Sequence, residues 1–299
     1  MTTLTRIGTQ TDILGESPLW HEQQRALYWV DIRRPALRKL HLHSGQLESW
    51  PLPDLVGSIA FCDDGGLLVA LPDRIALFDP ATRALQTLVR PAQQIEGHRF
   101  NDGRCDRQGR FWVGTMHNVT RAPEGVLYRL AAGRELQAVR SGIRIPNSLA
   151  WSPDGGIMYF ADSLRYAIFA YDFDAETGEM RNERVFARTA PPAFPDGSTV
   201  DAEGYLWNAE FNGSRIVRYA PDGRIDRVVE TPTRRPTCCA FGGPDLDILY
   251  VTTCSQQMTA AELAAEPLAG ALLALEPGVR GLPEPRFVTQ RSTETESNA

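Results

Sequence analysis

Oxygen-bearing side chains stand at one position of a pattern that repeats along this sequence. The six equivalent positions hold two carboxylates, two amides, one hydroxyl and one glycine: Glu16, Asp196, Asn101, Asn147, Thr237 and Gly57. Two carboxylates that are gathered away from water repel each other unless a cation lies between them. Carboxylate and amide oxygens are the ligands that hard divalent cations prefer. The pattern therefore predicts a site for one divalent cation, with positions left open for water and substrate.

The same residue types indicate which metal and which reaction to expect. They favour Ca²⁺, Mg²⁺ or Mn²⁺, and Zn²⁺ or Fe²⁺ are alternatives although no histidine belongs to the set. We predict that His21, His41 and His43 are surface residues. The chain has no Gly-x-Ser-x-Gly motif and no glycine-rich phosphate loop. Attack by a metal-assisted water is therefore predicted in place of a covalent nucleophile.

The elements that must position these residues are short strands. Pro146 to Gly155 has the pattern of a strand and a tight turn, and Ile157 to Ala161 that of a second strand. Five further segments match this template, and the copies lie roughly 40 to 48 residues apart, about the size of a four-stranded propeller blade. Amphipathic helical periodicity is nearly absent. We predict an all-β fold, a six-bladed β-propeller of four-stranded blades.

A propeller would place the six equivalent positions on a ring around its axis, at the start of the innermost strands. Taken alone, each residue has a simpler explanation. Asp196 belongs to a Pro-Asp-Gly turn motif, Asn147 follows a proline, and Glu16 could be a solvated loop acid. Their common register with the inner strands favours a functional site over isolated turns.

Both ends of the chain are predicted to complete the propeller. Leu4 to Gly8 and Arg286 to Thr289 are placed to pair with the terminal blade and close the ring, which removes an exposed sheet edge. A short helix is expected over Met258 to Ala265, with Thr259 as its N-cap. We predict one domain over residues 1–299, in which residues 291–299, rich in Ser, Thr and Glu, form a flexible tail.

Composition excludes several classes of function. The 299 residues include 31 basic and 37 acidic side chains, so the net charge is −6, and Lys39 is the only lysine. No basic patch is present to neutralise a nucleic-acid backbone, and no apolar stretch is long enough to cross a bilayer. The five cysteines are odd in number and lack metal-type spacing, which predicts buried free thiols. We expect a cytoplasmic protein without nucleic-acid or membrane partners.

A set of motifs runs in order along almost the whole chain. It comprises Leu14-Gly15-Glu16-Ser17-Pro18-Leu19-Trp20, Tyr28-Trp29-Val30-Asp31-Ile32, Arg99-Phe100-Asn101-Asp102-Gly103, Trp112-Val113-Gly114-Thr115-Met116, Pro146-Asn147-Ser148, Pro195-Asp196-Gly197 and Phe241-Gly242-Gly243-Pro244-Asp245. As a set it resembles the gluconolactonase, regucalcin (senescence marker protein) and luciferin-regenerating enzyme family. The Met116-His117 and Gly242 to Leu246 stretches resemble the bacterial sugar-acid lactonases.

The resemblance implies a six-bladed propeller that hydrolyses sugar lactones with the help of one divalent metal. It implies that Glu16, Asn147 and Asp196 bind the metal, and that Asp196 also serves as the base. Arg99 and Asn101 are implied to contact the sugar lactone. The substrates implied are glucono-, xylono-, arabinono- or galactonolactones, which are opened to aldonic acids in sugar catabolism.

In one respect this chain departs from the animal members of the family. They place a further substrate-contacting glutamate shortly after the Gly-Thr-Met run, whereas Met116 is followed here by His117-Asn118-Val119. Two other functions are alternatives: hydrolysis of another ester or lactone at the same metal centre, and calcium binding without catalysis. Arg99, Asn118 and Asn212 favour a polyol substrate over an apolar ester.

Overall fold

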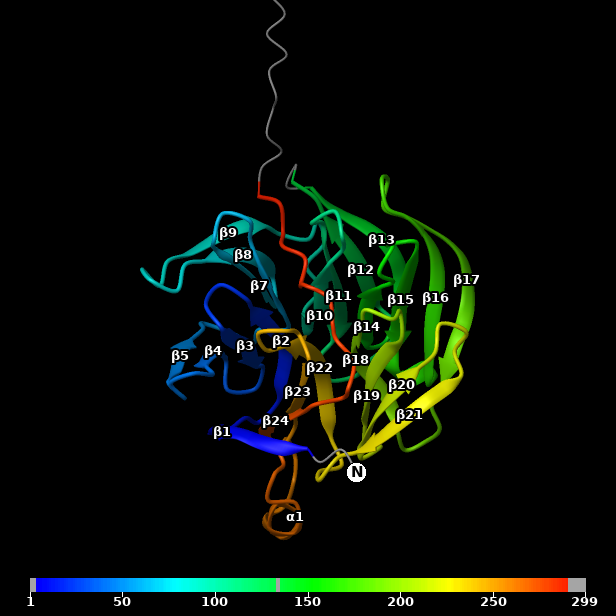
Figure 1. The fold of residues 1–299 in the computed structure, drawn as a ribbon. Coiled ribbons are helices and arrows are strands. Elements are labelled where there is room, and N and C mark those ends of the chain that lie inside the picture. Colours follow the sequence, from blue (N-terminus) through cyan, green and yellow to red (C-terminus); the bar gives the residue numbers. More distant parts are fainter. Residues whose placement is uncertain (1–3, 133–134, 290–299) are drawn as a thin grey trace, which may run out of the picture.

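Six four-stranded antiparallel sheets surround a central axis in the computed structural model, which describes residues 4–132 and 135–289 (Figure 1). The predicted six-bladed β-propeller is confirmed. We number the blades from 1 to 6 along the chain. From the inner strand outward, blade 1 contains β2 (Gly15–His21), β3 (Ala26–Asp31), β4 (Ala36–His41) and β5 (Leu47–Pro51), and blade 2 contains β6 (Ile59–Phe61), β7 (Leu67–Leu71), β8 (Arg74–Phe78) and β9 (Leu85–Val89). Blade 3 contains β10 (His98–Cys105), β11 (Phe111–His117), β12 (Gly125–Leu130) and β13 (Leu136–Ile143), and blade 4 contains β14 (Pro146–Trp151), β15 (Ile157–Asp162), β16 (Ala167–Asp174) and β17 (Glu179–Arg188). Blade 5 contains β18 (Phe194–Val200), β19 (Leu206–Phe211), β20 (Arg215–Tyr219) and β21 (Ile225–Glu230), and blade 6 contains β22 (Pro236–Gly242), β23 (Ile248–Thr253), β24 (Ala271–Leu275) and β1 (Thr5–Thr11).

Burial decreases from the inner to the outer strand of a blade. Every residue of the inner strand β22 is buried, whereas the outer strand β21 exposes most of its residues. Inner strands lie between neighbouring blades and are covered on both faces, so they need no alternation of polar and apolar residues. The core therefore lies between blades, where Trp207 of blade 5 packs edge to face on Phe241 of blade 6.

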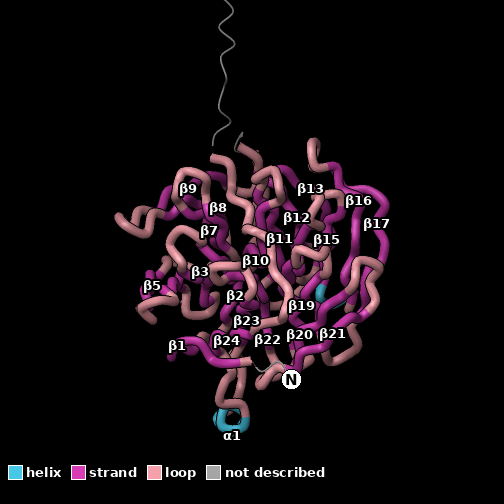
Figure 2. Tube along the Cα trace, in the orientation of Figure 1, coloured by secondary structure: helices cyan, strands magenta, loops and turns pink. Residues whose placement is uncertain are grey.

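Helical structure is sparse in the described residues (Figure 2). The helix α1 (Ala260–Ala265) lies in the β23–β24 connection, and a single 3₁₀ turn, η1 (Ser163–Arg165), lies between β15 and β16. The predicted cap is present. The Thr259 side chain accepts a hydrogen bond from the Glu262 backbone N–H, and the Glu262 side chain accepts one from the Thr259 backbone N–H. No helix in the described ranges has the length and apolar character to span a membrane.

The N-terminus closes the ring as predicted, but the C-terminus does not. The strand β1 pairs with β24 and supplies the outer strand of blade 6. Arg286 to Thr289 instead reaches blade 2, where Phe287 forms a parallel bridge with Cys62. The prediction was wrong because β1 already occupies the edge of blade 6, while Phe287 gains burial between blades 2 and 3 and keeps only 1% of its surface exposed. The predicted tail at 291–299 lies outside the described residues.

Residues 280–289 form a C-terminal strap across one end of the propeller (Figure 1, red). It contacts blade 5 through the Arg280 carbonyl, which accepts from the Ala202 N–H at 2.8 Å. It contacts blade 3 through an ion pair between Glu284 and Arg104 at 3.2 Å. These contacts lie near the hairpins between first and second strands, so the strap closes the channel at the end opposite the start of the inner strands.

The cysteines follow the expected burial, and two buried tryptophans bind carboxylates. All five cysteines are free and buried, as predicted. In blade 5 the carboxylate of Asp201 accepts hydrogen bonds from the Trp207 indole N–H at 2.9 Å and from Arg218 Nε at 2.9 Å. Asp106 and Trp112 make the same contact in blade 3 at 2.8 Å. Each group ties the turn after an inner strand to the second strand of its blade.

Candidate active site

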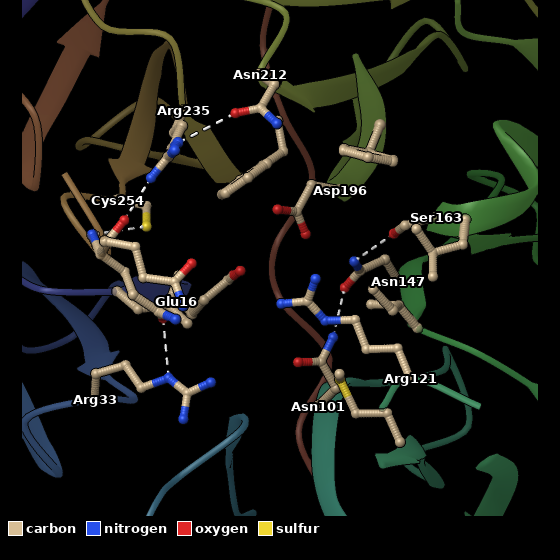
Figure 3. A pocket seen from close by; sticks show the side chains of 18 of the residues that line it. Glu16, Arg33, Asn101, Arg121, Asn147, Ser163, Asp196, Asn212, Arg235 and Cys254 are labelled. Atoms are coloured by element: carbon tan, nitrogen blue, oxygen red, sulfur yellow. Dashed lines mark hydrogen bonds between the residues drawn. The ribbon is translucent and has the colours of Figure 1, made fainter. Parts of the chain in front are cut away.

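A cavity of about 250 Å³ opens at the end of the channel where the inner strands begin (Figure 3). Figure 3 shows the Glu16 and Asp196 carboxylates pointing into this space from opposite sides. The structure brings together all five residues that the sequence predicts for the site, and the cavity lining includes Glu16, Arg99, Asn101, Asn147 and Asp196.

Irregular strand pairing turns these side chains toward the axis. The antiparallel register shifts between Glu16 and Leu19 in β2, and equivalent shifts follow Phe100 in β10, Asn147 in β14 and Pro195 in β18. Bulges of this kind bend a strand and redirect one side chain, and they are common beside functional sites. The site is thus positioned by the same local device in four blades.

Two members of the predicted ring do not line the cavity. The Thr237 hydroxyl is fully buried and donates to the Gly15 carbonyl at 2.6 Å, so it joins blade 6 to blade 1. Gly57 leaves no gap, because a Cβ atom there would lie 2.4 Å from the Phe100 carbonyl oxygen. The backbone of blade 3 therefore occupies the space that a side chain at position 57 would need.

A chain of hydrogen bonds orients the amides. Arg99 Nη1 donates to Asn101 Oδ1 at 2.7 Å, and Asn101 Nδ2 donates to Asn147 Oδ1 at 2.9 Å. Asn147 Nδ2 donates to Ser163 Oγ at 2.8 Å, and that hydroxyl donates to the Pro195 carbonyl at 2.7 Å. The chain crosses from blade 3 to blade 5 and fixes which atom of each amide faces its neighbour.

Removal from water and mutual repulsion act on the carboxylates. Desolvation, and then the charge of Asp102, raises the pKa of Glu16 to about 8. Desolvation, and then the charge of Glu16, raises the pKa of Asp196 well above its usual range. Arg99 is the basic side chain that attracts both of them. The ionised forms of the two acids are therefore disfavoured in this cavity unless a positive charge beyond Arg99 offsets them.

The residues present fit a hard divalent cation. The described residues contain no cluster of three or more His, Cys, Asp or Glu side chains, so a metal here needs an amide oxygen beside the two carboxylates. Asn147 Oδ1 faces an uncharged amide, and its second lone pair remains available for a metal ion. Two carboxylates and one carbonyl oxygen form a donor set typical of such cations, and a cation would offset the repulsion between the acids.

Sequence reasoning missed several residues that line the cavity. Most of them lie in the connections between the second and third strands of a blade, among them Arg33, Arg121, Ser163 and Gln256. Asn212, which was expected to favour a polyol substrate, lies in such a connection and does line the cavity. A usable signal existed, because in an antiparallel blade the second strand ends where the first begins. These connections must therefore emerge at the end of the channel that holds the ring.

The histidines stay outside the cavity. His21 was predicted to lie on the surface and is instead buried, with its ring 4.8 Å from that of Phe61 in an edge-to-face contact. The apolar contact with the neighbouring blade accounts for this error. His98 and His117 pack against each other with ring centroids 5.4 Å apart.

Asn118, which was expected to favour a polyol substrate, does not line the cavity. Its side-chain oxygen accepts a hydrogen bond from Arg99 Nε at 3.0 Å and so helps to orient that arginine.

Comparison with known proteins gives the arrangement a family. The SMP-30/Gluconolactonase/LRE-like region matches residues 14–255. The chain is 36% identical to a 6-deoxy-6-sulfogluconolactonase of Pseudomonas putida, over 95% of this chain and 98% of that protein. It is 38% identical to an L-arabinolactonase of Azospirillum brasilense, over 95% of each chain.

The solved structures agree with the sequence comparisons. A crystal structure from Agrobacterium tumefaciens, described as the calcium-binding protein regucalcin, superposes with a TM-score of 0.91 at 32% identity and covers 94% of this chain and 96% of its own. The match of a six-bladed fold and of sequence over nearly the whole length is decisive. This chain belongs to the SMP-30/gluconolactonase/LRE-like family.

Proposed function

We propose that this protein hydrolyses a sugar lactone to the corresponding aldonic acid and that a divalent metal ion is required. The observation that carries the proposal is the meeting of Glu16, Asn147 and Asp196 oxygens with Arg99 and Asn101 in one cavity. Relatives named for a sulfogluconolactone and for L-arabinolactone support an aldonolactone as the substrate. The regucalcin structure, described as calcium-binding, supports a metal at this site. As a small-molecule sugar reaction it belongs to carbohydrate metabolism.

Glu16, Asn147 and Asp196 would hold the metal. The chemistry that a divalent cation supplies when bound is electrophilic stabilisation of the charge that develops on the lactone oxygen. Arg99 and Asn101 bind the sugar, because guanidinium and amide groups match the hydroxyls of a polyol. Hydrogen bonds to Asn118 and Asn101 hold Arg99 in place, so its side chain loses little conformational entropy when substrate binds.

Asp196 is the group that moves the proton. Water forms the new bond to the lactone carbonyl carbon, and the Asp196 carboxylate accepts its proton. The ring C–O bond then breaks, and the proton passes to the oxygen that becomes the free hydroxyl of the acid. A lactone already hydrolyses slowly in water, so these few side chains, together with the cation that they would hold, are sufficient to supply the modest acceleration required.

A panel of aldonolactones tests this function. The protein is freed of metal with a chelator, reloaded with Ca²⁺, Mn²⁺, Mg²⁺, Zn²⁺ or Fe²⁺ in turn, and assayed by the acid released. We expect hydrolysis of at least one aldonolactone with at least one cation, and loss of activity in the metal-free protein. Cleavage of aromatic esters alone would indicate a different hydrolase. Cation binding without turnover of any lactone would indicate a binding protein instead.

A further inference from the structure

Four arginines line the cavity described above. Arg99 comes from the inner strand β10, Arg33 from the β3–β4 connection, Arg121 from the β11–β12 connection and Arg235 from the segment before β22. Figure 3 shows Arg33, Arg121 and Arg235 around the space into which Glu16 and Asp196 point. Basic side chains from three different blades therefore meet in a chain whose net charge is −6.

None of these four arginines makes an ion pair with a carboxylate in the described parts of the chain. The hydrogen-bond partners of the Arg33, Arg99 and Arg235 side chains are neutral. Arg33 Nε donates to Gln256 Oε1 at 2.9 Å, and Arg235 Nε donates to Asn212 Oδ1 at 3.1 Å. The buried Arg104, by contrast, is paired with Glu284. The cavity thus holds four guanidinium groups beside two carboxylates, and none of the four is in direct ion-pair contact with either acid.

The arginines also repel one another. Burial, and then the charge of Arg33, lowers the pKa of Arg99 to about 10. Burial, and then the charge of Arg121, lowers the pKa of Arg33. The oxygen of Asn118 accepts from both Arg33 Nη2 and Arg99 Nε, so a neutral amide stands where a carboxylate would have offset both charges. Such repulsion is relieved when an anion enters the cavity.

A neutral sugar does not account for this arrangement. Sugar hydroxyls are bound as well by amides and hydroxyls, which carry no cost of gathering like charges. A guanidinium group can donate to a hydroxyl, but its paired hydrogen bonds match carboxylate, phosphate and sulfonate oxygens better. Arg99 contacts Asn101 beside the two carboxylates, whereas the other three arginines come from connections at the rim. The anion is therefore expected near the rim, away from the reacting carbonyl.

We propose that the lactone hydrolysed by this protein carries an anionic group at the end remote from its carbonyl, bound by Arg33, Arg121 and Arg235. The inference rests on the lactonase function proposed above and narrows its substrate class. Hydrogen bonds to Gln256 hold both Arg33 Nε and Arg235 Nη1, so two of the three guanidinium groups are oriented before substrate arrives.

The test compares lactones that share one ring and differ only at carbon 6. Glucono-1,5-lactone is the neutral member, and the anionic members carry a 6-phosphate, a 6-sulfonate or a 6-carboxylate. With the metal-loaded enzyme we expect kcat/KM at least tenfold higher for one or more anionic members, mainly through a lower KM. The advantage must shrink as the NaCl concentration rises, because salt screens charges near the surface. The three anions distinguish which group is bound.

Single substitutions connect the preference to these arginines. Arg121→Met and Arg235→Met are expected to reduce the ratio of anionic to neutral kcat/KM at least fivefold each. Arg224→Met is the matched control, since it makes the same change in net charge at a side chain that is 82% exposed and lies on a blade 5 hairpin. It should leave the ratio unchanged.

The outcomes separate the two proposals. Equal kcat/KM for neutral and anionic lactones would overturn the substrate inference and leave the lactonase function standing. Equal losses on both substrate types in Arg121→Met and Arg235→Met would also overturn it. Failure to hydrolyse any member of the series, or any lactone of the wider panel, with every cation would reject the lactonase function itself.

Discussion

Asn101 and Asn147 have the same residue type and the same register, yet their surroundings differ. Asn101 Oδ1 accepts from the Arg99 guanidinium, and a metal ion placed there would be repelled by that charge. Asn147 Oδ1 accepts from a neutral amide, and its Nδ2 is fixed by Ser163. The contacts therefore support Asn147 as the proposed ligand and Asn101 as a substrate-binding residue.

The Asp196→Asn substitution distinguishes the two roles proposed for Asp196, metal ligand and general base. An amide keeps an oxygen that can bind the cation but cannot accept a proton. We expect kcat to fall by about a hundredfold or more at saturating metal, which is the usual contribution of a general base. The measurement is lactone hydrolysis with metal in excess and metal affinity determined in parallel. Near-normal kcat would leave Asp196 as a replaceable ligand and exclude it as the base.

Asn147→Asp changes the same site in the opposite direction. The added negative charge is expected to tighten metal binding and to impair turnover, because a cation with more anionic ligands is a weaker electrophile. Metal titration and kcat together check this pair of effects. Weaker metal binding in Asn147→Asp would show that position 147 does not face the cation.

At the scale of elements, the four blades that supply the site residues share an inner strand whose pairing is irregular near the cavity. The bulges in β2, β10, β14 and β18 redirect one side chain each, and the buried Asp–Trp groups anchor the turns that follow β10 and β18. In β10 and β18, the irregular pairing near the site is thus accompanied by buried hydrogen bonds at the other end of the strand. Bulges alone would leave the ring residues poorly oriented.

Asp201→Ala tests this support in blade 5. It removes the one fully buried acid that pairs with the buried Arg218 and leaves the Trp207 N–H without an acceptor. We expect the free energy of unfolding to fall by about 3 to 5 kcal/mol, the usual cost of breaking a buried pair. Asp222→Ala is the control on the same blade, because its ion pair with Arg224 is exposed and should contribute about 1 kcal/mol or less. Urea denaturation of both variants provides the comparison.

The strand β2 also carries a pH-sensitive group. Burial, and then the charge of Arg286 in the strap, lowers the pKa of His21. The unfolded chain therefore takes up a proton near the ordinary histidine pKa while the folded chain does not, so stability is complete above that pH and is lost as pH falls below it. We expect the melting temperature to drop from pH 7 to pH 5, with a smaller slope in His21→Gln.

His43→Gln is the matched control for His21, since His43 is exposed at the end of blade 1. It should keep the slope of the parent protein. An unchanged slope in His21→Gln would mean that other groups cause the acid sensitivity.

At the scale of the whole molecule, two terminal segments hold the six blades together. The strand β1 completes blade 6, and the C-terminal strap joins blades 5, 3 and 2 at the end opposite the cavity. Blades otherwise contact mainly their neighbours, so a segment that spans several of them adds contacts between parts distant in the chain. The strap leaves the cavity end open to substrate.

Phe287→Ala measures what the strap contributes. The ring is buried between blades 2 and 3 beside Phe100 and Phe111, and truncation leaves a cavity there. We expect a loss of about 3 to 5 kcal/mol in the free energy of unfolding. Ile225→Ala, at a side chain that is 56% exposed, should change it by about 0.5 kcal/mol or less. A small effect of Phe287→Ala would show that the strap is only loosely attached.

The sequence by itself determined the blades, the ring and the family. Strand and turn signals are local, so the segment from Pro146 to Ala161 predicts a hairpin whatever the rest of the chain does. Six copies of this segment in one register require a closed propeller. Register then places Glu16, Asn147 and Asp196 at one end of the axis. Location in the cytoplasm, a single domain and the roles of the site residues stay predictions.

Only the tertiary structure decided which other side chains share the cavity and where the C-terminus lies. Arg33, Arg121 and Arg235 belong to connections without a periodic signal, and Arg33 and Arg235 make hydrogen bonds to other blades. Gly57, His21 and Phe287 are governed by packing between blades, which no pattern within one blade reports. Local propensity determines the strands because it acts between neighbours in the sequence, whereas these residues are placed by burial and charge between segments far apart in the chain.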